Sequence, residues 1–200
     1  MKNNSKLWFV AIFLMTTISC SKNGELSLKE TFTTNDEFVS VNRVSSNITS
    51  IGNPYSITLE SVTDNGDNTW TWVWSVQNTN PGNGNNGTAQ DLSNWGFAFG
   101  ACVTASNLVN AGYSQNGTDW TNFNPQIAID PSQTCFTRPV VKFEFETTGS
   151  QKSWYRLVIN KNLPVNNNVS GYFKSGSRTG CGTFSFPGIG CDPIIIEIIE

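Results

Sequence analysis

Five cysteines are the side chains of this chain with the widest choice of chemistry: disulfide formation, metal binding or modification of the thiol. Cys20 lies near the start, and the other four are Cys102, Cys135, Cys181 and Cys191. No interval among these four has the C-x₂-C spacing typical of zinc sites. We therefore expect two disulfides among the later four, a separate role for Cys20, and neither a metal ion nor a cofactor.

Four cysteines allow three pairings, and we favour Cys102–Cys135 with Cys181–Cys191. The first bridge would enclose residues 104–134, a segment rich in Asn, Gly and Asp that we expect to be irregular and to need a tie. The second would close a glycine-rich turn, where the backbone can bend enough to meet disulfide geometry.

The chain contains no histidine, which removes Ser-His-Asp and Cys-His catalytic machinery and histidine-ligated metal centres. Carboxylates are then the main candidates for acid–base chemistry. Glu144 and Glu146 share one face of an expected strand, beside Lys142 and Arg156. A glycosidase uses such a carboxylate pair, but ion pairing across strands on a solvated face explains these residues more simply. We therefore predict that the protein is not an enzyme.

The N-terminal segment has the layout of an export signal. A basic start at residues 1–6 precedes an apolar run at 7–15, and small residues lead into Cys20. The run is too short to span a bilayer, as is typical of a cleavable signal peptide. The segment resembles the signal peptide of bacterial lipoproteins, although Thr17 stands where that family usually has leucine. The resemblance implies a lipid on Cys20; the alternative is an ordinary secreted protein with one unpaired cysteine.

Ser21 follows Cys20, where the lipoprotein family has aspartate for retention in the inner membrane. The resemblance therefore implies a lipid anchor in the outer membrane, on a face that the sequence leaves open. We divide the chain into a signal peptide (1–19), a flexible tether (20–50) and a folded domain (51–200). The formal net charge of −3 becomes more acidic once the two leader lysines are removed, which disfavours nucleic acid as a partner.

Alternating apolar and polar residues predict strands rather than helices in the folded domain. Residues 56–63 and 69–76 flank a turn at 64–68, and this pattern is typical of a hairpin. The turn lacks the ligand pattern of an EF-hand calcium loop. We expect Trp70, Trp72 and Trp74 to share one face and to pack in the core; the alternative is an exposed platform on which a sugar stacks. Further strands are expected at 95–103, 140–147, 153–159, 169–174, 183–186 and 194–199. Together these predict an all-β fold, a single antiparallel two-sheet β-sandwich, Ig-like or jelly-roll-like, with two disulfides.

Four aromatic residues stand among polar neighbours, where an exposed ring could stack on a sugar: Trp120, Phe123, Tyr113 and Trp154. Packing within their own loops is the alternative explanation. The composition around them, rich in Asn, Gly and Thr, suits a neutral ligand.

Several short motifs resemble a widespread secreted β-sandwich module of bacterial surface proteins. They are residues 67–70 (DNTW), 76–78 (VQN), 91–95 (DLSNW), 172–176 (YFKSG), Cys102, and Cys181 with Pro187 and Cys191. The resemblance covers roughly residues 55–192 and implies a fold but no reaction, and Asn94 stands where the module usually has histidine. The expected function is a membrane-anchored, non-catalytic structural or binding module. The alternative is a carbohydrate-binding accessory lipoprotein of a polysaccharide-uptake system. Its partners would be the membrane, through the lipid on Cys20, and a polysaccharide or another surface protein.

Overall fold

The computed structural model describes residues 53–191, and these form an all-β unit. Its strands are β1 Tyr55–Asp64, β2 Trp70–Asn78, β3 Leu92–Phe97, β4 Leu108–Ser114, β5 Thr121–Phe123, β6 Val141–Phe143, β7 Lys152–Ile159, β8 Val165–Ser175 and β9 Cys181–Ile189. One short 3₁₀ turn, η1 at Ala105–Asn107, precedes β4. Across residues 53–191, no helix has the length and apolar character needed to cross a membrane.

Several sequence predictions fall outside the described residues. These are the signal peptide, the lipid site at Cys20, the tether, and the strand expected at 194–199. They stay predictions.

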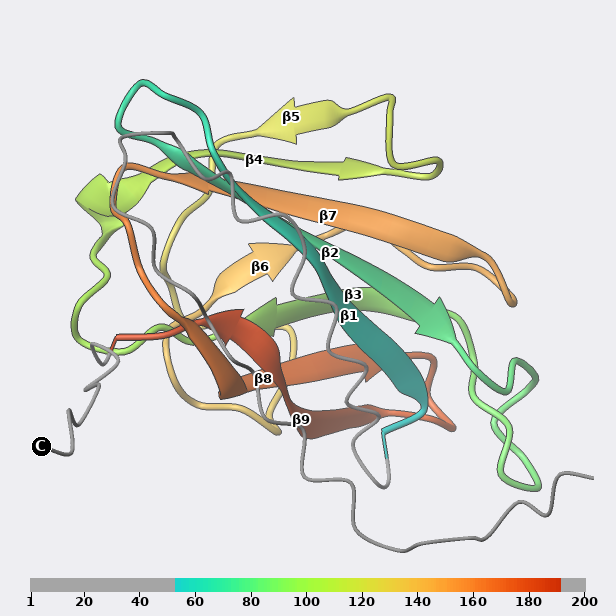
Figure 1. Ribbon diagram of the computed structural model, residues 1–200. Helices are drawn as coiled ribbons and strands as arrows, with labels where there is room; N and C mark the ends of the chain where they lie inside the picture. Colours follow the sequence, from blue (N-terminus) through green and yellow to red (C-terminus); the bar gives the residue numbers. More distant parts are fainter. Residues whose placement is uncertain (1–52, 192–200) are drawn as a thin grey trace, which may run out of the picture. The chain divides into compact units, whose positions relative to one another are not determined.

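The strands form two antiparallel sheets that pack against each other (Figure 1). One sheet has five strands in the order β1-β2-β7-β4-β5, and the other has four in the order β6-β3-β8-β9. The edge strands β1 and β9 lie close together on one side. On the other side, residues 124–140 connect edge strand β5 to edge strand β6. The predicted antiparallel two-sheet sandwich is confirmed.

The β1–β2 hairpin is built by its turn residues. Gly66 and Asn68 have positive φ angles of 77° and 63°, a conformation that Gly and Asn tolerate best. The Asp64 carboxylate accepts the Gly66 N–H at 2.8 Å, and the Asp67 carboxylate accepts the Thr69 N–H at 3.1 Å. Both carboxylates therefore hold the turn itself, which supports the interpretation of 64–68 as a hairpin turn.

Aromatic side chains from both sheets form the core. Trp72 and Trp74 of β2 and Trp95 of β3 are fully buried, whereas Trp70 is half-buried at the end of its strand. The Trp74 indole N–H donates to the Pro187 carbonyl at 2.9 Å. The prediction that the indole ladder faces the core is confirmed for its two inner members. Large rings that bury 150–250 Å² each account for much of the stability of such a core.

The expectation of an irregular segment at 104–134 is wrong, since β4 and β5 lie within it. β4 pairs with β7 and β5 extends the same sheet at its edge. These strands contain small and polar residues such as Gly112, so their sequences do not show a strand pattern. They form nonetheless, because strand formation depends on pairing and packing more than on intrinsic preference. Conversely, the strand expected at 95–103 ends at Phe97, and the strand expected at 140–147 is reduced to β6.

All four later cysteines form disulfides, as predicted, but the predicted pairing is wrong: the bridges are Cys102–Cys191 and Cys135–Cys181. Cys181 begins β9 and Cys191 follows its end, so an extended strand separates them by about 30 Å. β3 and β9 each run antiparallel to β8, and their ends therefore meet at one side of the sheet. There Cys102 reaches Cys191, with a Cα–Cα distance of 5.3 Å. The second bridge ties the 124–140 connection to β9.

Candidate functional site

The structure divides the four predicted ligand-binding aromatics into two pairs. Tyr113 of β4 pairs with the buried Tyr155 of β7, and Phe123 of β5 pairs with the buried Ala111, so both point to the inner side of the sheet. Trp154 alternates with Tyr155 along β7 and lies on the outer side. Trp120 also lies on the outer side, over Arg156. The four aromatics therefore do not form one site: Tyr113 and Phe123 belong to one region, and Trp120 and Trp154 belong to another.

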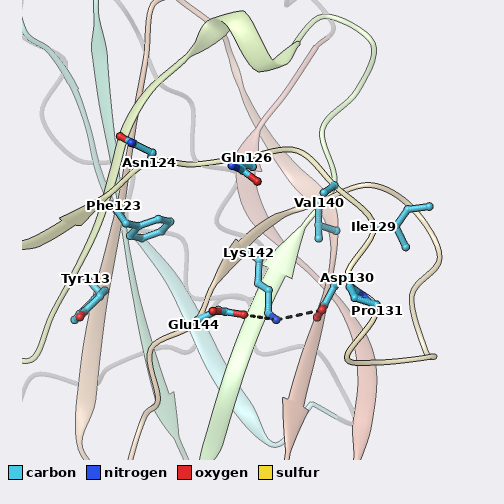
Figure 2. A pocket seen from close by; sticks show the side chains of 11 residues that line it. Tyr113, Phe123, Asn124, Gln126, Ile129, Asp130, Pro131, Val140, Lys142 and Glu144 are labelled. Carbon is cyan, nitrogen blue, oxygen red and sulfur yellow. Dashed lines mark hydrogen bonds and ion pairs between the residues drawn. The ribbon is translucent and has the colours of Figure 1, made fainter.

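Tyr113 and Phe123 line a pocket of about 460 Å³ where the two sheets part between β5 and β6 (Figure 2). The connection between these strands contributes Ile129 and Pro131 to the lining, and Figure 2 draws both on the side of the pocket opposite Tyr113 and Phe123. Ile129 is 61% exposed, which places an apolar side chain at the rim. Asn124 and Gln126 add amide groups to the lining.

Ring contacts fix the aromatic wall. Tyr113 stacks on Phe145 with ring centroids 4.0 Å apart, and Phe123 meets Phe143 edge to face at 5.8 Å. Phe143 belongs to β6, so the second contact joins the edge strands of the two sheets. Both lining rings are half-buried, and each therefore keeps some surface available to a ligand.

Lys142 lies between two carboxylates on the polar side of the pocket. Its Nζ lies 3.1 Å from Asp130 Oδ1 and 2.6 Å from Glu144 Oε1 (Figure 2). Burial alone lowers the pKa of Lys142, but the hydrogen bonds from Glu144 and Asp130 outweigh it and raise the pKa above its ordinary value. The expected pairing across strands is wrong here, since Glu144 lies two residues from Lys142 in the same segment and forms its ion pair along the chain. Glu146 and Arg156 take no part in it.

Asp130 is the site residue that the sequence analysis missed. It is buried, and Tyr172 donates to its Oδ2 at 2.6 Å while the Ser132 backbone and hydroxyl donate at 3.0 and 2.9 Å. Burial raises the pKa of Asp130, but hydrogen bonds from Tyr172, Ser132 and Lys142 together lower it to about 2. The only local signal is the Asp-Pro-Ser sequence, which is typical of a turn closed by an aspartate side chain.

Burial of Tyr172, and its donation to Asp130, raise the pKa of the phenol. Asp130 therefore stays ionised, and Tyr172 and Lys142 stay protonated, around neutral pH. A general acid or base works best with a pKa near the operating pH. The network accordingly suits a structural role, fixing the 124–140 connection to β6 and β8, better than proton transfer.

The second region lies on the outer side of the five-stranded sheet. The Arg156 guanidinium lies 4.6 Å from the Trp120 ring centroid, within cation–π distance. Arg156 Nη2 also donates to Asn122 Oδ1 at 2.7 Å. Along the same strand, Lys152 Nζ lies 5.8 Å from the Trp154 ring. This region therefore combines indole rings with cations, whereas the pocket combines rings with amides and carboxylates.

Searches for related proteins give no assignment. No family model matches the chain, and no curated protein matches it.

Proposed function

We propose that the protein is a non-catalytic carbohydrate-binding module carried by an outer-membrane lipoprotein, and that the pocket between β5 and β6 takes a neutral glycan. The observation that carries the proposal is the composition of the pocket walls. Tyr113 and Phe123 offer aromatic surface, and Asn124 and Gln126 offer amide donors and acceptors. A sugar ring has a C–H face and a hydroxyl edge, and these two walls complement both.

Size and charge support the same ligand class. The pocket volume of about 460 Å³ falls within the range of roughly 300 to 1,000 Å³ typical of small-molecule sites. Asp130, Lys142 and Glu144 together leave a net negative charge beside the pocket. This charge disfavours an acidic ligand and favours a neutral one.

The membrane anchor is part of the proposal and rests on the N-terminal sequence. Lipid on Cys20 would hold the binding domain at the outer membrane, on a tether at residues 20–50. Metabolic labelling with palmitate should mark the natural protein, and a Cys20→Ala variant should be unlabelled and released. Equal release of both proteins would contradict the anchor.

The pocket is tested by titrating neutral oligosaccharides against Asn124→Ala and Gln126→Ala. Both residues are exposed, so their removal should leave the fold intact. Each change should weaken binding roughly tenfold, the loss expected for one good hydrogen bond. Gln151→Ala, an exposed glutamine in the β6–β7 turn, is the matched control and should bind as the natural protein does. Failure to bind any neutral glycan in a broad panel would reject the function.

A further inference from the structure

We propose a second binding surface, on the outer side of the five-stranded sheet, that recognises an acidic polysaccharide of the uronate type. We call it the outer tryptophan face and define it by Trp120, Lys152, Trp154 and Arg156. It is separate from the pocket and does not depend on the function proposed for the pocket.

The pleat of β7 places these side chains together. Lys152, Trp154 and Arg156 alternate with the buried Ser153, Tyr155 and Leu157, so all three point away from the core. Trp120 immediately precedes edge strand β5 and lies across the Arg156 guanidinium. Two half-buried indoles therefore flank one arginine on a single face.

Arg156 is a cation without a counter-ion. Within residues 53–191, no carboxylate lies within ion-pairing distance of its guanidinium. Asn122 accepts one of its N–H groups, and Nε is buried without a hydrogen-bond partner. Burial lowers the pKa of this guanidinium, since no anion offsets its partial removal from water. A planar guanidinium that has no ion-pair partner is well suited to bind a carboxylate, which can accept two parallel N–H hydrogen bonds from it.

Two acids beside the face are already engaged: Glu60, which contacts Lys152, and Asp119, which precedes Trp120. Glu60 accepts from Ser75 Oγ at 2.5 Å and from Lys152 at 3.5 Å. Asp119 accepts from Asn116 Nδ2 at 2.7 Å. Neither carboxylate is paired with Arg156, so its charge is left for a ligand.

Two glycines shape the face before any ligand binds. Gly112 of β4 lies opposite Arg156, and a Cβ there would come within 3.2 Å of Arg156 Nε and 3.0 Å of Asn122 Oδ1. Because Gly112 has no Cβ, the Arg156 guanidinium can lie across the sheet at this position. Gly117, with a φ of +78°, packs against the Trp154 indole. A surface that is ordered in advance loses less entropy on binding.

A uronate polymer matches both features, because its sugar rings can stack on the indoles while a carboxylate reaches Arg156. Single-stranded nucleic acid also stacks on aromatic rings. However, its affinity depends on several phosphate contacts, and the face offers one uncompensated cation. The observations therefore favour an isolated carboxylate on a sugar ring.

The proposal is tested with the full-length protein in neutral detergent, using polygalacturonate and its fully methyl-esterified, uncharged form as probes. Arg156→Gln should weaken binding of polygalacturonate by roughly tenfold or more, since a charge-assisted hydrogen bond is lost. Binding of the esterified form should be unchanged by this substitution. Arg156→Lys should give an intermediate loss, because it keeps the charge without the planar fork. Trp154→Ala should weaken both probes by roughly fivefold.

Arg138→Gln is the matched control, since it removes the same charge from an exposed arginine outside the face. Equal affinity of the natural protein for the two polymers would overturn the proposal. So would the same loss in Arg138→Gln, or tighter binding of a single-stranded oligothymidylate. Gln126→Ala, which tests the pocket, should leave binding of polygalacturonate unchanged, so failure of one site is distinguishable from failure of the other.

Discussion

The pocket and the outer tryptophan face lie on opposite sides of the five-stranded sheet, and they differ in charge. Tyr113 of β4 lines the pocket, and the adjacent Gly112 packs against Arg156 on the outer side. The pocket carries a net negative charge from Asp130, Lys142 and Glu144, whereas the outer face carries an arginine without a counter-ion. Because neighbouring residues of a strand point to opposite faces of the sheet, adjacent positions in β4 contribute to two surfaces of different charge.

The two regions also differ in what holds them in place. One wall of the pocket is the 124–140 connection, and it depends on long-range links: the Cys135–Cys181 disulfide and the hydrogen bond from Tyr172 to Asp130. The outer face depends on strand pairing and on a local loop. In that loop the Asn116 side chain accepts the N–H groups of Thr118 and Asp119. Damage to the long-range links should therefore affect the pocket selectively.

The largest effect is expected from removing the Cys135–Cys181 bridge. The double variant Cys135→Ser/Cys181→Ser should lower the free energy of unfolding by about 4 kcal/mol, from the loop entropy of a 46-residue separation. It should also abolish glycan binding in the pocket and spare binding of polygalacturonate at the outer face. Urea unfolding and titration measure the two results.

Cys102→Ser/Cys191→Ser provides the matched control for that experiment. It should lose similar stability, because its separation of 89 residues adds only slightly more loop entropy. Its pocket should still bind, because this bridge joins the segments that follow β3 and β9 and neither of its cysteines belongs to the 124–140 connection. If both double variants keep the pocket equally well, the disulfide does not hold the pocket wall.

A smaller, acid-dependent effect is expected from Asp130. Its pKa of about 2 in the folded protein lies below the ordinary value of 3.8, so folding favours the ionised form. This contribution is fully present above about pH 4 and is lost as the pH falls toward 2. It amounts to about 2 kcal/mol. Asp130→Asn should be less stable at neutral pH and should lose less stability over that pH range.

Urea unfolding of both proteins at several pH values checks this expectation. Glu144→Gln is the control, because it removes the exposed carboxylate that pairs with the same lysine, Lys142. This variant should keep the acid dependence of the natural protein. The assignment to Asp130 fails if the asparagine variant and the natural protein lose the same stability in acid.

The smallest effect is expected from Gly112→Ala. The added methyl group would crowd Asn122 and Arg156 and displace the guanidinium, with a loss of about 1 kcal/mol in stability. Affinity for polygalacturonate should fall severalfold, and affinity for a neutral glycan should stay the same. An unchanged polygalacturonate affinity would show that the position of Arg156 does not limit binding.

Only some residues of the two regions could be recognised in advance. Trp120, Trp154, Tyr113 and Phe123 stand out in the sequence because each is a large ring among polar neighbours. Their division into two regions was not predictable, since β4 and β5 were not recognised as strands. Asp130 was missed because its partners Lys142 and Tyr172 are distant in the sequence and meet it only through the sheet.

The class of fold, the indole ladder in the core and the use of four cysteines in disulfides all follow from the sequence alone. Period-two alternation and the burial of large rings are local properties, and they can be read along a single strand. The pairing of the cysteines and the position of Asp130, in contrast, depend on how the two sheets are assembled. Strand order brings the ends of β3 and β9 together and folds the 124–140 connection over β6 and β8. Such long-range contacts depend on sheet topology, which the spacing of residues along the chain does not encode.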